Sequence, residues 1–354
     1  MSQAITEAQT RLDQHTRDMV SWHFSPETGC PYWLDQASSL PFNPLTDVTC
    51  FNDLLQFEAF DDEILRKEDP AQFIPKAFAD RPYNIFETGG TTGMPKQRIG
   101  WDDYKTDYTE FSEHYGTDFF PMGRPWIMIG PTGPRRLRLA IEHLANIRKS
   151  PCYFIDLDPR WVKRLIGMGE LKMARAYQEH VIDQAATIIR HRDVGSIFTT
   201  PKLLESLAER LSLADAGIGG VFAGGTTMTP QYVRFIEEEV LEGKVNFAPT
   251  YGNTLMGLAI SKKRAPGEYS LTYHAPQPRA ILRIVNPDNP DELVNYDDYG
   301  RVELTTMTKE FFMPRFLERD EAIRRQPCEE FPWDGVGDVR PFQSDGKAVI
   351  EGVY

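Results

Sequence analysis

Residues 87–96, ETGGTTGMPK, bring together in one short run the residue types that bind phosphate. Glycines let backbone N–H groups approach anionic oxygens because they carry no Cβ, threonine hydroxyls add hydrogen-bond donors, and Lys96 adds a mobile positive charge. The spacing is not that of a Walker A loop, which requires Gly-Lys-Ser/Thr, because Met94 and Pro95 separate Gly93 from Lys96. The run therefore predicts a polyphosphate cradle outside the kinase and GTPase classes; an ordinary glycine- and threonine-rich surface turn is the alternative.

Two later segments contain glycines or an acid that could contact a bound ligand. The pair Gly224 and Gly225 follows an apolar strand start and offers backbone that carries no side chain. Asp338, in the run Gly-Val-Gly-Asp, offers two acceptor oxygens. The alternatives are a strand-to-helix turn for the glycine pair and an acid in a solvated turn for Asp338.

Length and composition indicate a large α/β protein without a membrane span. The 354 residues correspond to about two domain equivalents or to one large α/β unit. Hydrophobic residues make up 41% and charged residues 26%, which is ordinary for a globular protein, and no run of about 18 apolar residues occurs. The N-terminus lacks the apolar core of a secretion signal, so we expect a cytoplasmic protein.

Net charge and cysteine spacing argue against nucleic-acid binding, a zinc site and a disulfide framework. The net charge of -13, from 52 acids and 39 bases, disfavours nonspecific binding to nucleic acid. The strongest basic run contains Arg135, Arg136 and Arg138, which we interpret as solvated arginines at a helix start, close to an anionic ligand. The four cysteines are widely spaced and form no CxxC pair, which predicts reduced thiols rather than a zinc site or disulfides.

Composition and hydrophobic pattern change at two points along the chain. Residues 1–80 are rich in aromatics and prolines and predict short helices that cap a core formed later in the chain. Residues 81–264 alternate strand-like runs, such as 126–130 and 152–155, with helical spacing, which predicts a largely parallel sheet and the nucleotide-binding core. Residues 265–354 predict a smaller β-rich subdomain.

Local signals place individual elements inside this pattern. Thr200 and Thr229 each precede a proline and a run with helical spacing, so each is expected to begin a helix, the second ending at Gly243. The apolar runs at 280–285 and 301–304 predict antiparallel strands.

Taken together, these motifs resemble the signatures of the adenylate-forming superfamily of acyl-CoA synthetases, luciferases and adenylation domains. Gly90 to Lys96 matches its phosphate loop position by position, with Gly89 for a usual serine and Gln97 for the closing glycine. The segment 249–254 is similar to its Tyr-Gly-x-Thr-Glu motif. The resemblance implies that ATP or AMP is bound by Thr88, Gly89, Gly90, Thr91, Thr92, Gly93, Lys96, Ala223, Gly224, Gly225, Tyr251, Gly252, Asn253, Thr254 and Asp338.

The resemblance implies roles for these residues. A carboxylic acid would displace pyrophosphate from Mg-ATP, a step that needs alignment and charge neutralisation but no side-chain nucleophile. Lys96 and Thr254 would be the catalytic residues. The remaining contacts would be Thr91 and Thr92 with the β- and γ-oxygens, Lys96 with the released phosphates, Thr254 with the α-phosphate, Tyr251 with adenine and Asp338 with the ribose.

One position departs from the superfamily pattern. Leu255 stands where a glutamate normally helps to hold Mg²⁺, and leucine cannot ligate a hard cation. We therefore expect Mg²⁺ as a cofactor but assign it no ligands.

The resemblance covers residues 80–354 and implies the large N-terminal domain of layered α/β sheets with a smaller β subdomain. Residues 345–352 resemble the hairpin before the interdomain hinge, so the mobile C-terminal domain is expected to be absent. The outline is similar to that of phenylacetate-CoA ligases and of a stand-alone phenazine antibiotic biosynthesis protein. This likeness implies an aromatic acid, such as a phenazine carboxylate.

The expected acid pocket is apolar with one or two polar anchors. A core position is the alternative for its apolar members, and Arg135 or Arg136 could pair with a second carboxylate. The expected wall residues are Gly130, Thr132, Gly133, Leu255, Met256 and Gly257.

Three fates of the acyl group stay open at this point. A separate acceptor or reductase protein could receive it, or Cys328 could accept it within an acyl-protein synthetase. In the third case Leu255 and the missing domain leave a non-catalytic nucleotide-binding scaffold.

Overall fold

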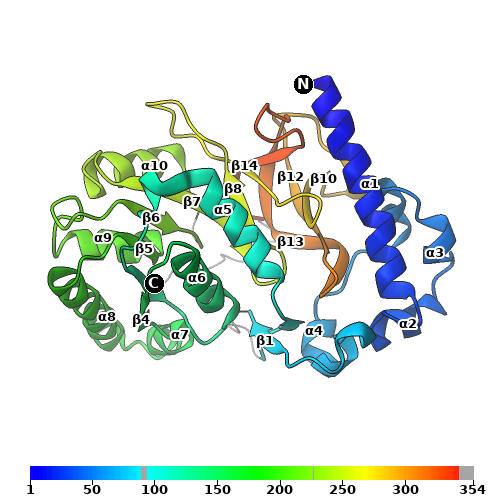
Figure 1. The fold of residues 1–354 in the computed structure, drawn as a ribbon, viewed down its shortest axis with the longest axis horizontal. Helices are drawn as coiled ribbons and strands as arrows, with labels where there is room; N and C mark the ends of the chain where they lie inside the picture. The colour runs from blue at the N-terminus through cyan, green and yellow to red at the C-terminus, as the bar shows by residue number, and fades with distance from the viewer. Residues whose placement is uncertain (89–93, 226, 343–354) are drawn as a thin grey trace.

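The computed structural model describes residues 1–88, 94–225 and 227–342, which form a mixed α/β structure (Figure 1). The helices are α1 (Ser2–Phe24), α2 (Pro31–Ala37), α3 (Pro44–Asp47), η1 (Phe51–Gln56), α4 (Ile64–Lys67), η2 (Pro70–Phe73), η3 (Lys76–Phe78), α5 (Asp103–Phe119), α6 (Arg136–Ile147), α7 (Pro159–Gly167), α8 (Leu171–His191), α9 (Pro201–Ala208), α10 (Pro230–Phe235) and η4 (Ile236–Val240). The strands are β1 (Asn84–Glu87), β2 (Gln97–Gly100), β3 (Trp126–Gly130), β4 (Cys152–Asp156), β5 (Ser196–Thr199), β6 (Gly220–Ala223), β7 (Asn246–Asn253), β8 (Gly257–Ser261), β9 (Thr272–His274), β10 (Ala280–Asn286), β11 (Asn289–Leu293), β12 (Tyr299–Met307), β13 (Phe312–Arg325) and β14 (Gly335–Pro341).

One continuous sheet of twelve strands runs through the molecule, in the order β11-β10-β12-β13-β14-β9-β8-β7-β6-β5-β3-β4. The neighbours from β4 to β7 are parallel, and those from β7 to β11 are antiparallel. Strand β7 belongs to both halves: residues 246–249 pair with β6, and residues 250–253 pair with β8. The two halves of the sheet therefore meet within a single strand.

Successive side chains of the parallel strands pack into two different apolar layers, one on each face of the sheet. In β3, Trp126 and Met128 pack with residues of α5 and α6, whereas Ile127 and Ile129 pack with residues of α8 and α9. Successive side chains of a strand point to opposite faces, so a strand covered by helices on both faces is apolar throughout. The parallel sheet and the strand-like runs expected at 126–130 and 152–155 are thus confirmed.

The two helix starts expected from Thr-Pro pairs are also present. Helix α9 begins after Thr200, and α10 begins after Thr229, whose hydroxyl accepts from the backbone N–H of Tyr232 at 3.2 Å. Proline at the first helical position loses no intrahelical hydrogen bond, because that N–H has no partner within the helix.

The N-terminal cap contains the expected short helices, from α2 to η3, but it begins with a long one, because α1 spans 23 residues. It lies against the antiparallel half of the molecule, where Trp22 donates to the carbonyl of Lys309 at 3.0 Å and Nε2 of His23 lies 2.7 Å from the carbonyl of Thr308 (Figure 1). Burial lowers the pKa of His23 to about 4, so it is neutral at physiological pH. A long amphipathic helix gains its stability from such packing rather than from local propensity.

The antiparallel half contains the two strands expected at 280–285 and 301–304, as β10 and β12. It continues the parallel sheet without interruption, since Ile260 of β8 pairs with His274 of β9 across the expected boundary at 264. In the described part, no helix is both long enough and apolar enough to cross a membrane. All four cysteines are free.

Candidate functional site

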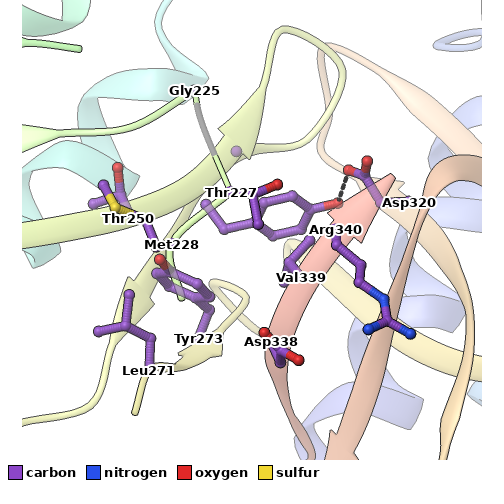
Figure 2. A pocket seen from close by; sticks show the side chains of 12 residues that line it. Gly225, Thr227, Met228, Thr250, Leu271, Tyr273, Asp320, Asp338, Val339 and Arg340 are labelled. Carbon is purple, nitrogen blue, oxygen red and sulfur yellow. Dashed lines mark hydrogen bonds between the residues drawn. The ribbon is translucent and has the colours of Figure 1, made fainter. Parts of the chain in front are cut away.

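A cavity of about 190 Å³ lies between β7 and β14, and we call it the β14 cavity (Figure 2). Residues from the two halves of the sheet face each other across it. Its lining residues are Gly225, Thr227, Met228, Thr250, Tyr251, Gly252, Leu271, Tyr273, Asp320, Asp338, Val339 and Arg340.

Two acids project into the β14 cavity from the antiparallel strands. Asp320 accepts a hydrogen bond from the Tyr251 hydroxyl at 2.8 Å, drawn as a dashed line in Figure 2. Burial and the nearby charges of Glu318 and Asp320 raise the pKa of Tyr251 well above its usual value, so it remains a donor. Asp338 is half-buried, accepts from the hydroxyl of Tyr299 and has a φ of 45°, a conformation that aspartate tolerates better than most residues.

A second cavity, of about 250 Å³, lies beside helix α6, and we call it the α6 cavity. It shares Gly225, Thr250 and Gly252 with the β14 cavity, so the two cavities have a common wall. Its other lining residues are Glu87, Tyr108, Pro131, Pro134, Arg136, Leu137, Pro159, Phe198, Thr200, Phe222, Gly224, Asn253, Thr254, Gly257 and Leu258.

The α6 cavity lies at the carboxyl ends of the parallel strands. Pro131 follows β3, Thr200 follows β5 and Gly224 follows β6, while Asn253 ends β7. This edge is where open parallel sheets bind ligands, because the loops that leave the strands diverge there. Its walls are mostly aromatic and aliphatic.

Gly225 forms part of both cavities, and its backbone needs the absence of a side chain. Its φ is 88°, a left-handed conformation that glycine adopts without strain. A Cβ at this position would meet no described atom within 4 Å, so it would project into open space. The residue therefore leaves room on both sides of the common wall.

Thr254 and Asn253 hold the turn between β7 and β8. The Thr254 hydroxyl donates to the carbonyl of Glu87 at 3.2 Å, and Asn253 Oδ1 accepts from the backbone N–H groups of Leu255 and Met256, each at 2.9 Å. The Asn253 amide also donates to Glu318. These contacts tie the wall of the α6 cavity to both β1 and β13.

Lys96 lines neither of these two cavities. Its ammonium pairs with Asp62 and lies 3.8 Å from Glu63, and burial, together with Arg319, lowers its pKa to about 8. The backbone N–H groups of Thr88 and Lys96 donate to the Lys96 carbonyl and the Thr88 hydroxyl, at 3.0 and 3.1 Å, which closes the β1–β2 hairpin. The intervening Gly89, Gly90, Thr91, Thr92 and Gly93, like the expected hairpin at 345–352, lie outside the described residues.

Part of the expected acid pocket is corrected. Leu255 and Met256 are 3% and 2% exposed and belong to the hydrophobic core, and the Leu255 carbonyl accepts from Arg98 at 2.9 Å. The tight Asn253 turn directs these two side chains inward. The segment 130–134 does contribute to the α6 cavity, but through Pro131 and Pro134 rather than through Gly130, Thr132 and Gly133. The Thr132 hydroxyl donates to Asp156 at 2.8 Å, and Gly257 lines the α6 cavity as expected.

Glu318 and Asp320 were missed by the sequence reasoning. Burial, reinforced by Asp320, raises the pKa of Glu318 to about 7. In the sheet, β14, β9 and β8 separate β13 from β7, yet these acids contact Asn253 and Tyr251, so the sheet curls until its halves face each other. The sequence contained one signal for these residues, two acids at alternate positions of a strand, but it did not show which residues would face them.

The described residues show no group of three or more His, Cys, Asp or Glu side chains placed to hold a metal ion. Leu255 carries no ligating side-chain atom and is turned into the core. A hard cation at this position would rely on phosphate oxygens and water.

Comparisons with known proteins agree with this architecture. No family model and no curated protein matches the sequence. An open conformation of 2-hydroxyisobutyryl-CoA ligase, in complex with 2-HIB-AMP and CoA, matches with a TM-score of 0.63 and 13% identity over 93% of this chain and 72% of that chain. Its thioesterification state matches with a TM-score of 0.65 and 13% identity over 94% and 67%.

The chain shares the fold of 2-hydroxyisobutyryl-CoA ligase. At such low identity the likeness concerns the fold alone, and it confirms the fold class expected from the motifs. In this chain the β14 cavity and the α6 cavity lie on either side of the end of β7. The narrower resemblance to phenylacetate-CoA ligases and to phenazine biosynthesis is not supported by these comparisons.

Proposed function

We propose that this protein activates a small carboxylic acid with ATP, forming an acyl-adenylate and pyrophosphate. The observation that carries the proposal is the common wall: two cavities of different character meet at Gly225, Thr250 and Gly252. A nucleotide in the β14 cavity would thus have its phosphate end beside an acid in the α6 cavity. Holding both reactants in line converts a bimolecular reaction into an effectively unimolecular one.

The residues of the β14 cavity fit a nucleoside monophosphate. Asp338 supplies two acceptor oxygens for the ribose hydroxyls, and Tyr251 supplies an aromatic wall for the base. Thr254, on the α6 side, would offer a hydroxyl to the α-phosphate in place of its contact with the Glu87 carbonyl. These groups position the nucleotide, and Mg²⁺, when bound through the phosphates, would neutralise charge.

The α6 cavity has the size and the lining to hold a small aromatic acid. Its volume of about 250 Å³ lies below the roughly 300–1,000 Å³ typical of sites for drug-sized ligands. Tyr108, Phe198 and Phe222 would contact a flat ring. We therefore favour a single-ring aromatic acid over a phenazine carboxylate, with a separate cytoplasmic acceptor or reductase protein to take the acyl group.

A screen of ATP–pyrophosphate exchange over aromatic and aliphatic acids tests the proposal. Exchange that depends on one acid class is the expected result. AMP binding should be measured in parallel by calorimetry, because it reports the β14 cavity alone. If AMP binds but no acid supports exchange, the adenylation proposal fails while the nucleotide site stands.

A non-catalytic scaffold is the second candidate, favoured by the ion pair between Lys96 and Asp62. In this case the lysine neutralises a local acid rather than a phosphate, and the chain positions a partner. Exchange measured with and without cell extract from the source organism separates the two candidates, because a scaffold binds AMP but never supports exchange.

The acyl-protein synthetase alternative has less support. Cys328 lines neither of the two cavities, and its backbone N–H donates to the carbonyl of Phe331 at 2.8 Å. Acyl labelling of the protein that is lost in Cys328→Ser but not in Cys152→Ser would restore it.

A further inference from the structure

Arg136 is a buried arginine that belongs to the lining of the α6 cavity. It begins helix α6, and only 5% of its side chain is exposed. The expectation of a solvated arginine at this helix start is therefore wrong for Arg136. Arg135, one residue earlier, is exposed and has a φ of 76°. Burying a guanidinium is costly unless its donors find acceptors.

One arm of the Arg136 guanidinium is fixed and the other lacks an acceptor. Nη1 donates to Asp103 at 2.8 Å, and the guanidinium carbon lies 5.7 and 5.8 Å from the ring centres of Phe86 and Tyr104. Nη2 is buried and has no hydrogen-bond partner among the described residues. A rigidly held group with an unsatisfied buried donor is a feature that requires an explanation.

Gly257 packs directly beside the buried Nη2. Its φ is 110°, and a Cβ there would lie 3.2 Å from Nη2 and 2.8 Å from Asp107 Oδ2. Gly257 lines the same cavity as Arg136. A residue with a side chain would therefore both strain the backbone and crowd the guanidinium.

The acids around Arg136 already have partners. Asp103 is shared with Arg98, Asp107 pairs with Arg279 at 2.8 Å, and Glu310 accepts from backbone N–H groups of the Trp101–Asp102 segment. Arg279 also pairs with Glu110 at the exposed edge. What Nη2 lacks is therefore an oxygen acceptor, not a net negative charge.

We infer that Arg136 is a specificity-determining residue, and that the acid held in the α6 cavity carries a second oxygen acceptor besides its reacting carboxylate. The inference rests on the proposed function for the identity of the reacting group. The second oxygen belongs to a hydroxyl or a carboxylate on the ring. A hydrogen bond from a charged, buried donor favours such a ligand over its plain analogue by about tenfold or more.

The test compares ligands that differ only at that oxygen. Dissociation constants for benzoate, the three monohydroxybenzoates and isophthalate are measured by calorimetry on the full chain, with AMP present. At least one oxygen-bearing acid should bind about tenfold more tightly than benzoate, and the favoured member tells hydroxyl from carboxylate. Equal binding of all five, or binding of none, overturns the inference.

Variants add a second, independent readout. Arg136→Lys keeps a positive charge near Asp103 but removes the second arm, so the preference over benzoate should disappear. Arg138→Lys, two residues along the same helix at an exposed position, should keep it. Preserved preference in a folded Arg136→Lys variant would contradict the assignment, and if that variant does not fold, the wild-type ligand series still decides.

Pyrophosphate exchange with the same acids separates this inference from the proposed function. Exchange with benzoate and its oxygen-bearing analogues at equal efficiency would support adenylation and refute the role of Arg136. Selective binding without exchange would support Arg136 and refute adenylation.

Discussion

The β14 cavity and the α6 cavity share a wall but are built in different ways. The α6 cavity collects the ends of neighbouring parallel strands and the start of one helix, and its walls are largely apolar. The β14 cavity brings together side chains of β7, β13 and β14, and acids from the antiparallel half face it. Ligand binding in the α6 cavity should therefore depend on shape and on one buried donor, whereas binding in the β14 cavity should depend on titratable groups from distant segments.

The largest expected effect concerns pH and Glu318, which lines neither cavity but accepts from Asn253 in the wall of the α6 cavity. The pKa of Glu318, raised to about 7 by burial, lies above its usual value of 4.5, so the folded state binds this proton more tightly than the unfolded state does. Its contribution to stability is full below about pH 4.5 and is lost as the pH rises through about 7. Relative to Glu318→Gln, the wild type should lose on the order of 3 kcal/mol between pH 4.5 and 8, measured by urea unfolding.

The exposed Glu292→Gln is the matched control for this pH dependence, and its slope should equal that of the wild type. If Glu318→Gln also follows the wild type, the buried acid does not titrate as its surroundings imply.

Asp338→Ala should weaken the use of ATP, which we place in the β14 cavity, and should leave acid binding in the α6 cavity unchanged. Loss of a charged hydrogen-bonding contact of roughly 1.5 to 3 kcal/mol lowers kcat/KM for ATP by about tenfold or more. The KM for the acid should change little. Asp298→Ala, at an exposed acid outside both cavities, is the control. A change in the acid KM alone would reverse the assignment of the two cavities.

Lys96→Ala tests a residue that belongs to neither cavity. If Lys96 exchanges Asp62 for the released phosphates during turnover, pyrophosphate exchange should fall by about tenfold. The exposed Lys67→Ala should leave it unchanged. Unchanged exchange in a folded Lys96→Ala variant would leave the lysine with its ion pair to Asp62 as its whole role.

Gly225→Ala should affect both cavities together, and by the smallest amount. A Cβ at φ 88° strains the backbone by roughly 1 to 2 kcal/mol and projects from the common wall. The KM values for ATP and for the acid should both rise, by about fivefold. Gly243→Ala, with a φ of 62° and a similarly open surrounding, carries comparable strain away from the wall and serves as the control. A rise in only one KM would show that the wall is not shared.

The sequence predicted what is local. Glycine pairs, Thr-Pro helix starts and the Gly-Val-Gly-Asp run depend on a few consecutive residues, and Gly225, Tyr251 and Asp338 do line one cavity. The parallel strand at 126–130 could be predicted because its apolar run is continuous.

What could not be predicted depends on long-range contacts. Arg136 looks like a surface residue in its basic run, and only the approach of Asp103 from α5 allows it to be buried. Leu255 was expected in the pocket because it follows a motif, but the Asn253 turn directs it inward. The bond from Tyr251 to Asp320 requires the curl of a twelve-stranded sheet, which no periodicity reveals.

The double pairing of β7 has a consequence for insertions and deletions. Residues 250–253 and 257–260 are held in antiparallel register, with Asn253 opposite Gly257 and a short turn at 254–256. A slip of one residue in such a pair would exchange the side chains that point up with those that point down. Tyr251 and Asn253 would then leave β13, and Gly257 would leave Arg136. The length of this turn therefore determines which side chains of β7 and β8 face each of the two cavities.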